Sequence, residues 1–335
     1  MSADFTQFIK ILGKGKKGAR PLTTDEAELA MSMMLAGQAL PEQEGAFWML
    51  IRIREETVEE TVGFTKAVRA HLAKQMPNAK VDIDWPAYAG KRNELPWFLL
   101  SALALADAGY QIVMHGHSFK GEGRLYVDEV IQSLGLPFLT EQNAHLLEDH
   151  LAQHRFLYLP LASIDKRLSK MMDLKLSLGL RSPVNTVVRM MNPLQAKHSV
   201  HGVFHKGYDD LHAQACLQLE DPSVLIFRGG NGEAEINPER EVTLATVQDG
   251  QLKWDKWARY EHEHTRNKDN LSIERLIDHW TGASVDPFGE KAVLQTMAGV
   301  LGLIHNEPDQ AHCLELAALL WQSRHREYLQ YNQVV

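Results

Sequence analysis

The stretch from Met114 to Gly135 has the composition of a loop that holds phosphate. A run rich in β-formers ends in His115-Gly116, a loop with two glycines follows, and an amphipathic helix comes next. The loop carries the cations Lys120 and Arg124. Anions tend to bind at the carboxyl ends of strands in open α/β sheets, where helix N-termini also point. The pattern therefore indicates a phosphate site, either with chemistry on the phosphate or without it.

His115 and His117 are the residues of this stretch that could transfer a proton. Imidazole titrates near neutral pH, so either side chain could act as a general acid or base. A histidine that hydrogen-bonds the neighbouring loop backbone is an equally good interpretation. The residues alone therefore assign no catalytic group.

Further cations lie on loops that contain glycine. The run GKGKKGAR carries Lys14, Lys16, Lys17 and Arg20, and Lys91-Arg92 follows Gly90. Flexible cations can settle on phosphates without a fixed register, and each contact releases condensed counterions. Alternatively, the cations of the first run lie on a loop that is only solvated. Lys91 and Arg92 could instead be surface residues that form scattered salt bridges.

Histidines also surround the predicted strand in HSVHGVFHKGY, which raises the question of a metal site. Because side chains alternate along a strand, His198 and His201 would face opposite sides, whereas His201 and His205 share one. No cysteine or carboxylate nearby completes a ligand set. We therefore predict no metal and no cofactor, and count the flanking Lys197 and Lys206 as candidate phosphate contacts.

Four aromatic residues lie near the basic loops, and rings in such positions could stack on bases. For Trp97 the helical setting favours packing in the core. The four residues are Tyr88, Trp97, Phe119 and Tyr126.

Length and composition place limits on the class of protein. The 335 residues suffice for one large domain or two ordinary ones, and 44% hydrophobic with 23% charged residues is typical of globular proteins. We expect no signal peptide and no membrane span, because no apolar run approaches the roughly 20 residues that a span needs. Two cysteines without a CxxC pair favour the cytoplasm. The net charge of −8 by itself argues against a nucleic-acid partner. Binding of nucleic acid is decided, however, by local clusters of positive charge and not by the net charge.

The elements expected to position these residues fall into two groups. Residues 1–75 show helical spacing, with Thr23 and Thr57 as N-caps and Glu60 at a capping-box distance from Thr57. From residue 76 to 335, strands alternate with helices, and Asp249-Gly250 marks a hairpin. The predicted fold is a small helical domain and a larger α/β domain with a mainly parallel sheet. The expected strands are 110–116, 155–161, 200–205 and 224–230.

Two segments resemble anthranilate phosphoribosyltransferase and its nucleoside-phosphorylase relatives. The first runs from Leu22 to Gly63, and the second, LSLGLRSPVNTVVRMMNP, has Arg181 and Asn185 in register. The resemblance implies a homodimer formed through helical parts, to which residues of about 163–190 contribute. It also implies that Arg181 faces the carboxylate of an aromatic acid. The matching positions of the first segment are Leu22, Thr23, Glu26, Ala27, Gly37, Gln43, Ala46, Phe47, Arg52, Glu56, Thr57, Glu59, Glu60 and Gly63.

The sequence departs from this family where the family binds phosphoribosyl diphosphate. The glycine-rich diphosphate loop of the family corresponds here to YAGKRNELPW, with one glycine followed by Lys91 and Arg92. Of the acidic pair that holds magnesium in the family, Ala234 replaces the Asp and Glu235 remains, with Glu233 as a candidate substitute. These changes argue against phosphoribosyl transfer.

The same departures resemble the YbiB-type branch of the family, whose members bind nucleic acid without sequence specificity. We therefore expect a cytoplasmic homodimer that binds DNA, or RNA, through phosphate contacts. The alternative is a phosphoribosyltransferase or nucleoside phosphorylase on an unidentified substrate. The candidate contacts are Lys14, Lys16, Lys17, Arg20, Lys91, Arg92, His115, His117, Lys120, Arg124, Arg181, Lys197 and Lys206.

Overall fold

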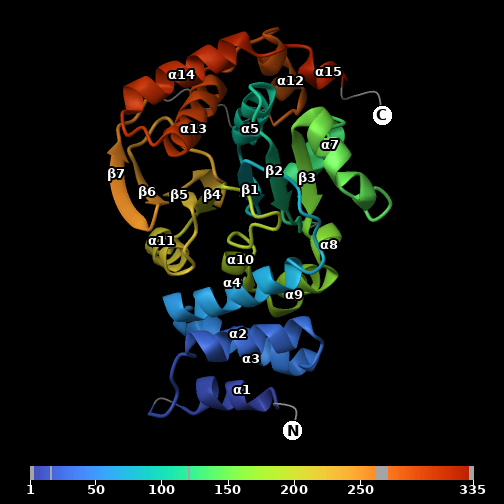
Figure 1. The fold of residues 1–335 in the computed structure, drawn as a ribbon, viewed down its shortest axis with the longest axis vertical. Helices are drawn as coiled ribbons and strands as arrows, with labels where there is room; N and C mark the ends of the chain where they lie inside the picture. The colour runs from blue at the N-terminus through green and yellow to red at the C-terminus, as the bar shows by residue number, and fades with distance from the viewer. Residues whose placement is uncertain (1–3, 16, 120, 261–270, 332–335) are drawn as a thin grey trace.

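The computed structural model describes residues 4–15, 17–119, 121–260 and 271–331. At one end of the molecule, four helices pack on one another (Figure 1). Capping boxes at Thr23 and Thr57 begin α2 and α4. The sequence predicts an N-cap at each position and a capping box at Thr57. The two helices pack so closely that a Cβ on Gly63 would lie 2.3 Å from the carbonyl oxygen of Thr24. The helices are α1 (Thr6–Gly13), α2 (Thr24–Leu35), α3 (Pro41–Arg54) and α4 (Val58–Leu72).

The second part is built on a seven-stranded sheet in the order β3-β2-β1-β4-β5-β6-β7. Strands β1 to β5 pair in parallel, whereas β6 and β7 form an antiparallel hairpin at the edge. The predicted fold class, a helical part with a larger, mainly parallel α/β part, is confirmed. The strands are β1 (Ile83–Ala87), β2 (Ile112–Gly116), β3 (Phe156–Pro160), β4 (His198–Val203), β5 (Ser223–Arg228), β6 (Val242–Gln248) and β7 (Gln251–Trp257).

Strand β1 is central, and the sequence patterns did not predict it, because it contains Pro86. A proline has no N–H and is normally excluded from central strands. Here the N–H of His198 donates to the carbonyl of Asp82. The backbone hydrogen-bonding groups of the even-numbered residues of β1, which include Pro86, therefore point toward β4. The β4 strand pairs only with Ile83 and Asp84. Pro86 therefore lies beyond the last pairing with β4, and its missing N–H breaks no ladder.

Helices cover both faces of the sheet (Figure 1). On one face of the sheet, the main core lies under α5 and α13, and α13 packs on both α5 and α14. On the other face, α11 covers a smaller core. Among the described residues, no helix is both long and apolar enough to cross a membrane. The covering helices are α5 (Trp97–Asp107), α6 (Val127–Ser133), α7 (Leu147–His154), α11 (Tyr208–Gln218), α12 (Glu274–Thr281), α13 (Pro287–His305), α14 (Gln310–Ser323) and α15 (Tyr328–Tyr331).

After β3 the chain returns to the helical end through α8 (Leu161–Ile164), α9 (Lys166–Leu178) and α10 (Val184–Val187). Asp165 caps α9 and also binds His71 of α4 at 2.9 Å. Arg167 donates to the carbonyl of Met34 and, at 3.0 Å, to Glu44. These contacts hold the segment between the carboxyl ends of the strands and the four N-terminal helices, which is where the candidate site lies.

Candidate anion-binding site

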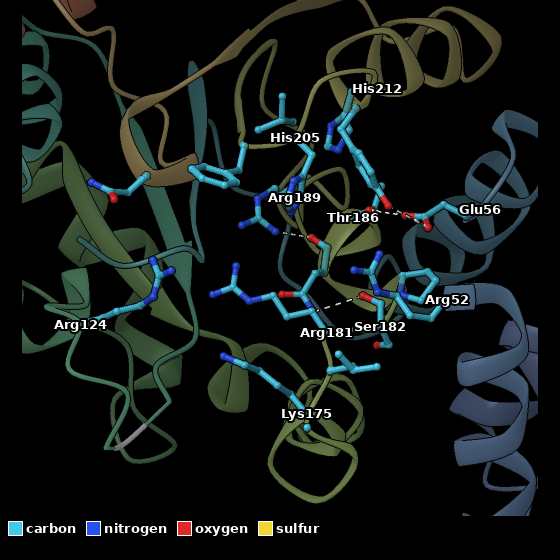
Figure 2. A pocket seen from close by; sticks show the side chains of 18 residues that line it. Arg52, Glu56, Arg124, Lys175, Arg181, Ser182, Thr186, Arg189, His205 and His212 are labelled. Carbon is cyan, nitrogen blue, oxygen red and sulfur yellow. Dashed lines mark hydrogen bonds between the residues drawn. The ribbon is translucent and has the colours of Figure 1, made fainter. Parts of the chain in front are cut away.

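A pocket of about 330 Å³ lies between the helical end and the carboxyl ends of the strands (Figure 2). Its walls come from the end of α3, from the segment between α9 and α10, and from the loops that follow β2, β4 and β5. Its lining is rich in cations and poor in acids. The charged and histidine side chains on its walls are Arg52, Glu56, Arg124, Lys175, Arg181, Arg189, His205 and His212.

Four cations, which we call the basic cluster, gather at one side of this pocket. They are Arg92, Arg124, Lys175 and Arg181, and together with Glu122 they line a second hollow of about 400 Å³. Arg124, Lys175 and Arg181 line the first pocket as well. Arg124 is fixed in place because it donates to the carbonyls of Ala89 and Gly90 at 2.9 and 3.0 Å. Burial and the neighbouring Arg181 and Arg92 lower the pKa of Arg124. The cluster therefore has a local excess of positive charge that an anion would relieve.

Arg189 adds a buried guanidinium to the pocket wall. It is 8% exposed, lies 5.6 Å from the ring centre of Tyr88, and donates to the carbonyl of Asn185. Burial, reinforced by Arg181, lowers the pKa of Arg189 to about 10. Within the part of the chain that the structure describes, no carboxylate forms an ion pair with it. The charge of Glu233 acts on Arg189 without forming an ion pair with it, so an anionic ligand in the pocket would further stabilise this buried guanidinium.

Two further carboxylates near these cations, Glu122 and Glu56, already have partners. Glu122 accepts from Lys175 and, at 2.9 Å, from the hydroxyl of Tyr126. Burial alone would raise the pKa of Glu122, but these two hydrogen bonds outweigh burial and lower it. Glu56 accepts from the hydroxyl of Thr186 at 2.7 Å. In the described part of the chain, neither carboxylate forms an ion pair with Arg124, Arg181 or Arg189.

Lys91 does not join the basic cluster. Its side chain is 1% exposed, and its Nζ lies 2.5 Å from Oε1 of Glu235 and 3.7 Å from Oε2 of Glu94. Burial raises the pKa of Glu235 even though Lys91 is beside it. Because an ammonium group held by two carboxylates inside the protein cannot reach a phosphate, we remove Lys91 from the candidate contacts. Arg92, the next residue, is exposed.

Glu233, the other acid of this loop, binds backbone. Its Oε1 accepts from the N–H groups of Ala89 and Gly90 at 2.9 and 2.6 Å. It therefore holds the loop after β1 in position. Together with the Lys91 pair, this engages Glu235 with an internal cation and Oε1 of Glu233 with amides, whereas the buried Oε2 of Glu233 has no hydrogen-bond partner among the described residues.

The two histidines of the opening motif occupy different environments. His115 is fully buried, with Nδ1 2.7 Å from the hydroxyl of Tyr88 and Nε2 3.1 Å from Oδ1 of Asp84. His115 is thus held by side chains in the interior, and we remove it from the candidate contacts. His117 lies 2.9 Å from Asp173 and packs its ring on Phe119.

The remaining candidates are spread over the molecule. Lys14 and Lys17 are exposed on the loop after α1, at the end far from the sheet, and Arg20 is paired with Glu26 at 2.6 Å (Figure 1). Lys197 precedes β4 and so lies at the opposite end of the strands from the pocket, whereas Lys206 is exposed in the loop that follows β4. The structure therefore unites Arg92, Arg124 and Arg181 but not the others. Lys16 and Lys120 lie outside the described residues.

The aromatic residues that we expected to stack on bases are buried instead: Tyr88, Trp97, Phe119 and Tyr126 are each at most 2% exposed. The exposed ring on the pocket wall belongs to Phe204, which is 62% exposed. The sequence pattern included Phe204 in a strand, but β4 ends at Val203. The residue therefore begins the loop and turns its ring outward.

Comparisons with known proteins agree with this architecture. Residues 6–72 match the helical bundle domain of a glycosyl transferase family. The chain is 27% identical over 246 residues to the anthranilate phosphoribosyltransferase of a Bradyrhizobium strain, which covers 72% of this chain and 71% of that protein. It is 26% identical over 242 residues to the uncharacterized protein YbiB of Escherichia coli, over 71% of this chain and 74% of that one.

Solved structures share the fold over nearly the whole chain. The anthranilate phosphoribosyltransferase of Thermus thermophilus aligns with a TM-score of 0.74 at 18% identity, over 99% of this chain and 100% of that one. The enzyme of Saccharomyces cerevisiae in complex with PRPP and Mg aligns with a TM-score of 0.75 at 15% identity, over 98% and 96%. The fold is thus a helical bundle joined to an α/β domain. More specifically, the fold is that of anthranilate phosphoribosyltransferases.

The acids that would correspond to a magnesium site do not fit a divalent cation here. An ammonium group already lies between Glu235 and Glu94, and it would repel a metal ion placed there. No other group of three or more histidine, cysteine, aspartate or glutamate side chains in the described ranges is arranged to hold a metal.

Proposed function

We propose that this protein binds nucleic acid without sequence specificity, as a homodimer whose former transferase site no longer transfers phosphoribosyl groups. The observation that carries the proposal is the basic cluster of Arg92, Arg124, Lys175 and Arg181, with Arg189 behind it. Phosphates are recognised by such clusters of long cations, and contacts to phosphates carry no sequence information. The overall charge of −8 would confine binding to this region.

The environment of Lys91 supports the loss of transfer. A transferase that uses a diphosphate bridged by magnesium needs free carboxylates to hold the metal. In this chain Glu235 binds Lys91, and Glu233 binds two backbone amides. The loop that would wrap the diphosphate has Lys91 and Arg92 after a single glycine.

Apolar side chains on the helical end support self-association. Leu29, Leu40 and Ile53 are exposed by 46%, 61% and 82%, and all three belong to α2, α3 or the turn between them. Apolar side chains that are exposed in a single subunit can be buried at an interface between two copies. A homodimer joined there would bring two basic clusters into one assembly.

A second candidate function is retained because the pocket also suits a small anion. Arg181 and Asn185 line it, and they match positions of the transferase family. A phosphorolytic enzyme would require inorganic phosphate, which the basic cluster could bind, and no diphosphate-bridging metal. This candidate predicts turnover of a nucleoside or sugar substrate.

Binding and turnover are best measured side by side. We expect fluorescence anisotropy to show similar affinities for DNA and RNA oligonucleotides of unrelated sequence. Four phosphate contacts would lower affinity for single strands about 50-fold between about 50 and about 200 mM salt. We expect no consumption of phosphoribosyl diphosphate with anthranilate. Turnover without oligonucleotide binding would overturn the proposal and favour the enzyme.

A further inference from the structure

The shape of the pocket distinguishes it from an open binding groove. Its volume of about 330 Å³ is at the lower end of the range for small-molecule sites, so it has room for a single nucleotide-sized group. Arg189 lines it and is 92% buried, whereas Phe204 on its wall is exposed. A continuous strand could cross the exposed cations of the basic cluster, but only a terminal group could fill the pocket.

The cations of this pocket converge on one place. In Figure 2 the charged ends of Arg124, Arg181, Arg189 and Lys175 point into the same space. Arg181 is the common neighbour, because its charge lowers the pKa of each of the other three. Of these four, Lys175 alone has a carboxylate partner, Glu122. Three guanidinium groups thus point into one part of the pocket.

The charge of the ligand follows from this arrangement. A phosphodiester inside a strand carries about one negative charge, whereas a phosphate monoester carries about 1.5 to 2 near neutral pH and has three acceptor oxygens. Three guanidinium groups match a phosphate monoester, which has nearly two charges and three acceptor oxygens, better than a phosphodiester, which has one charge. The exposed ring of Phe204, on the same wall, offers a face on which the attached nucleoside can stack.

We propose that this pocket takes a phosphate monoester, supplied by the phosphorylated end of a nucleic-acid strand. This inference rests on the proposed function and adds a preference for ends to it. A free nucleoside monophosphate offers the same chemistry, so the experiment must separate the two sources.

The test compares oligonucleotides of one sequence that differ only at their ends. Anisotropy competition would use strands with a 5′-phosphate, with a 3′-phosphate, with neither, and a closed circle. One additional charge-assisted contact is worth about 1.5 kcal/mol, which corresponds to about tenfold in affinity. We expect at least one phosphorylated strand to bind about tenfold more tightly than the unphosphorylated strand and the circle.

Two variants connect this preference to the pocket. Arg181→Gln removes the central cation, and we expect the preference for phosphorylated ends to fall to about onefold. Lys253→Gln removes an exposed cation from the edge strand β7 and is the matched control, in which the preference should persist. Lys175→Gln provides a second substitution should Arg181→Gln fail to fold.

The outcomes separate this inference from the function on which it rests. Equal affinity for all four strands overturns the pocket inference and leaves nonspecific binding intact. A third outcome is that the wild type binds adenosine monophosphate but no strand, and that Arg181→Gln loses this binding. This result overturns the proposed function and also overturns strand ends as the source of the phosphate. Binding of neither strands nor adenosine monophosphate overturns both proposals.

Discussion

Lys91 and Glu235 are 144 positions apart in the sequence, yet Nζ of the first lies 2.5 Å from Oε1 of the second in the interior. Glu235 also accepts from the backbone N–H of Phe98 at 3.0 Å, at the start of α5. The pair thus joins the loops after β1 and β5 and neutralises an acid that would otherwise be buried alone.

Removing Lys91 should destabilise the protein and leave nucleic-acid affinity unchanged. Breaking a buried ion pair from one side leaves an uncompensated charge, at a cost of about 3 kcal/mol. We expect Lys91→Met to lower the free energy of unfolding in urea by about this amount. Because Lys91 is buried, the affinity of the folded variant for DNA should match that of the wild type.

The double variant Lys91→Met with Glu235→Gln is the control for this pair. It removes the buried charge but keeps an oxygen that can accept from Phe98, so we expect it to regain part of the lost stability. A loss of DNA affinity in Lys91→Met with normal stability would contradict the assignment of Lys91 to the interior.

Substituting Arg124 and Arg181 should weaken binding by the same factor for every sequence. Both side chains belong to the basic cluster, and each phosphate contact that is lost lowers the salt slope for single strands by about 0.7. We therefore expect the double glutamine variant to bind more weakly at low salt and to show a slope shallower by about 1.4. Lys253→Gln should leave affinity and slope unchanged. A change in sequence preference would instead indicate contacts with bases.

The sequence predicted much of the framework of this molecule because the relevant signals are local. The capping boxes at Thr23 and Thr57 depend on residues three positions apart, and the Asp249-Gly250 turn sets the β6–β7 hairpin. The cations Arg92, Arg124 and Arg181 are also found at the site. Strand β1 was missed because the tolerance of Pro86 depends on where β4 stops pairing.

The errors at the candidate site arise from partners that are distant in sequence. Lys91 has the same local sequence signals as Arg92, and its nearest carboxylate partner inside the protein, Glu235, is distant in the sequence. Lys175 on α9 and Arg189 after α10 have no glycine-rich context, so no loop signal marks them. They reach the pocket because contacts such as that of His71 with Asp165 place their segment beside the strand ends.

The loop with Lys14, Lys16 and Lys17 provides a test of how far the binding surface extends. Of these residues, Lys14 and Lys17 lie at the end of the molecule far from the sheet (Figure 1), so we expect a strand of about five nucleotides to occupy the basic cluster without contacting them. We expect the triple alanine variant to bind such a short strand normally. A strand several times longer should bind the triple alanine variant more weakly than it binds the wild type, and with a shallower salt slope. Equal affinity for the long strand would show that the loop is only solvated.

Buried histidines should make the protein less stable in mild acid. His212 is buried in contact with His201, and burial, reinforced by Arg189, lowers the pKa of His212 to about 3. An unfolded histidine titrates near its usual pKa of about 6.5, so below that pH the unfolded state binds more protons than the folded state. The free energy of unfolding should therefore fall as the pH drops below about 6.5, by about 2 kcal/mol at pH about 5 from His212 alone. Urea unfolding at pH about 7.5 and about 5 measures this difference.

The variant His212→Gln is the control, because it has no group to protonate at this position. The difference in the free energy of unfolding between the two pH values should shrink by about 2 kcal/mol. An unchanged difference would mean that His212 is already solvated in the folded protein.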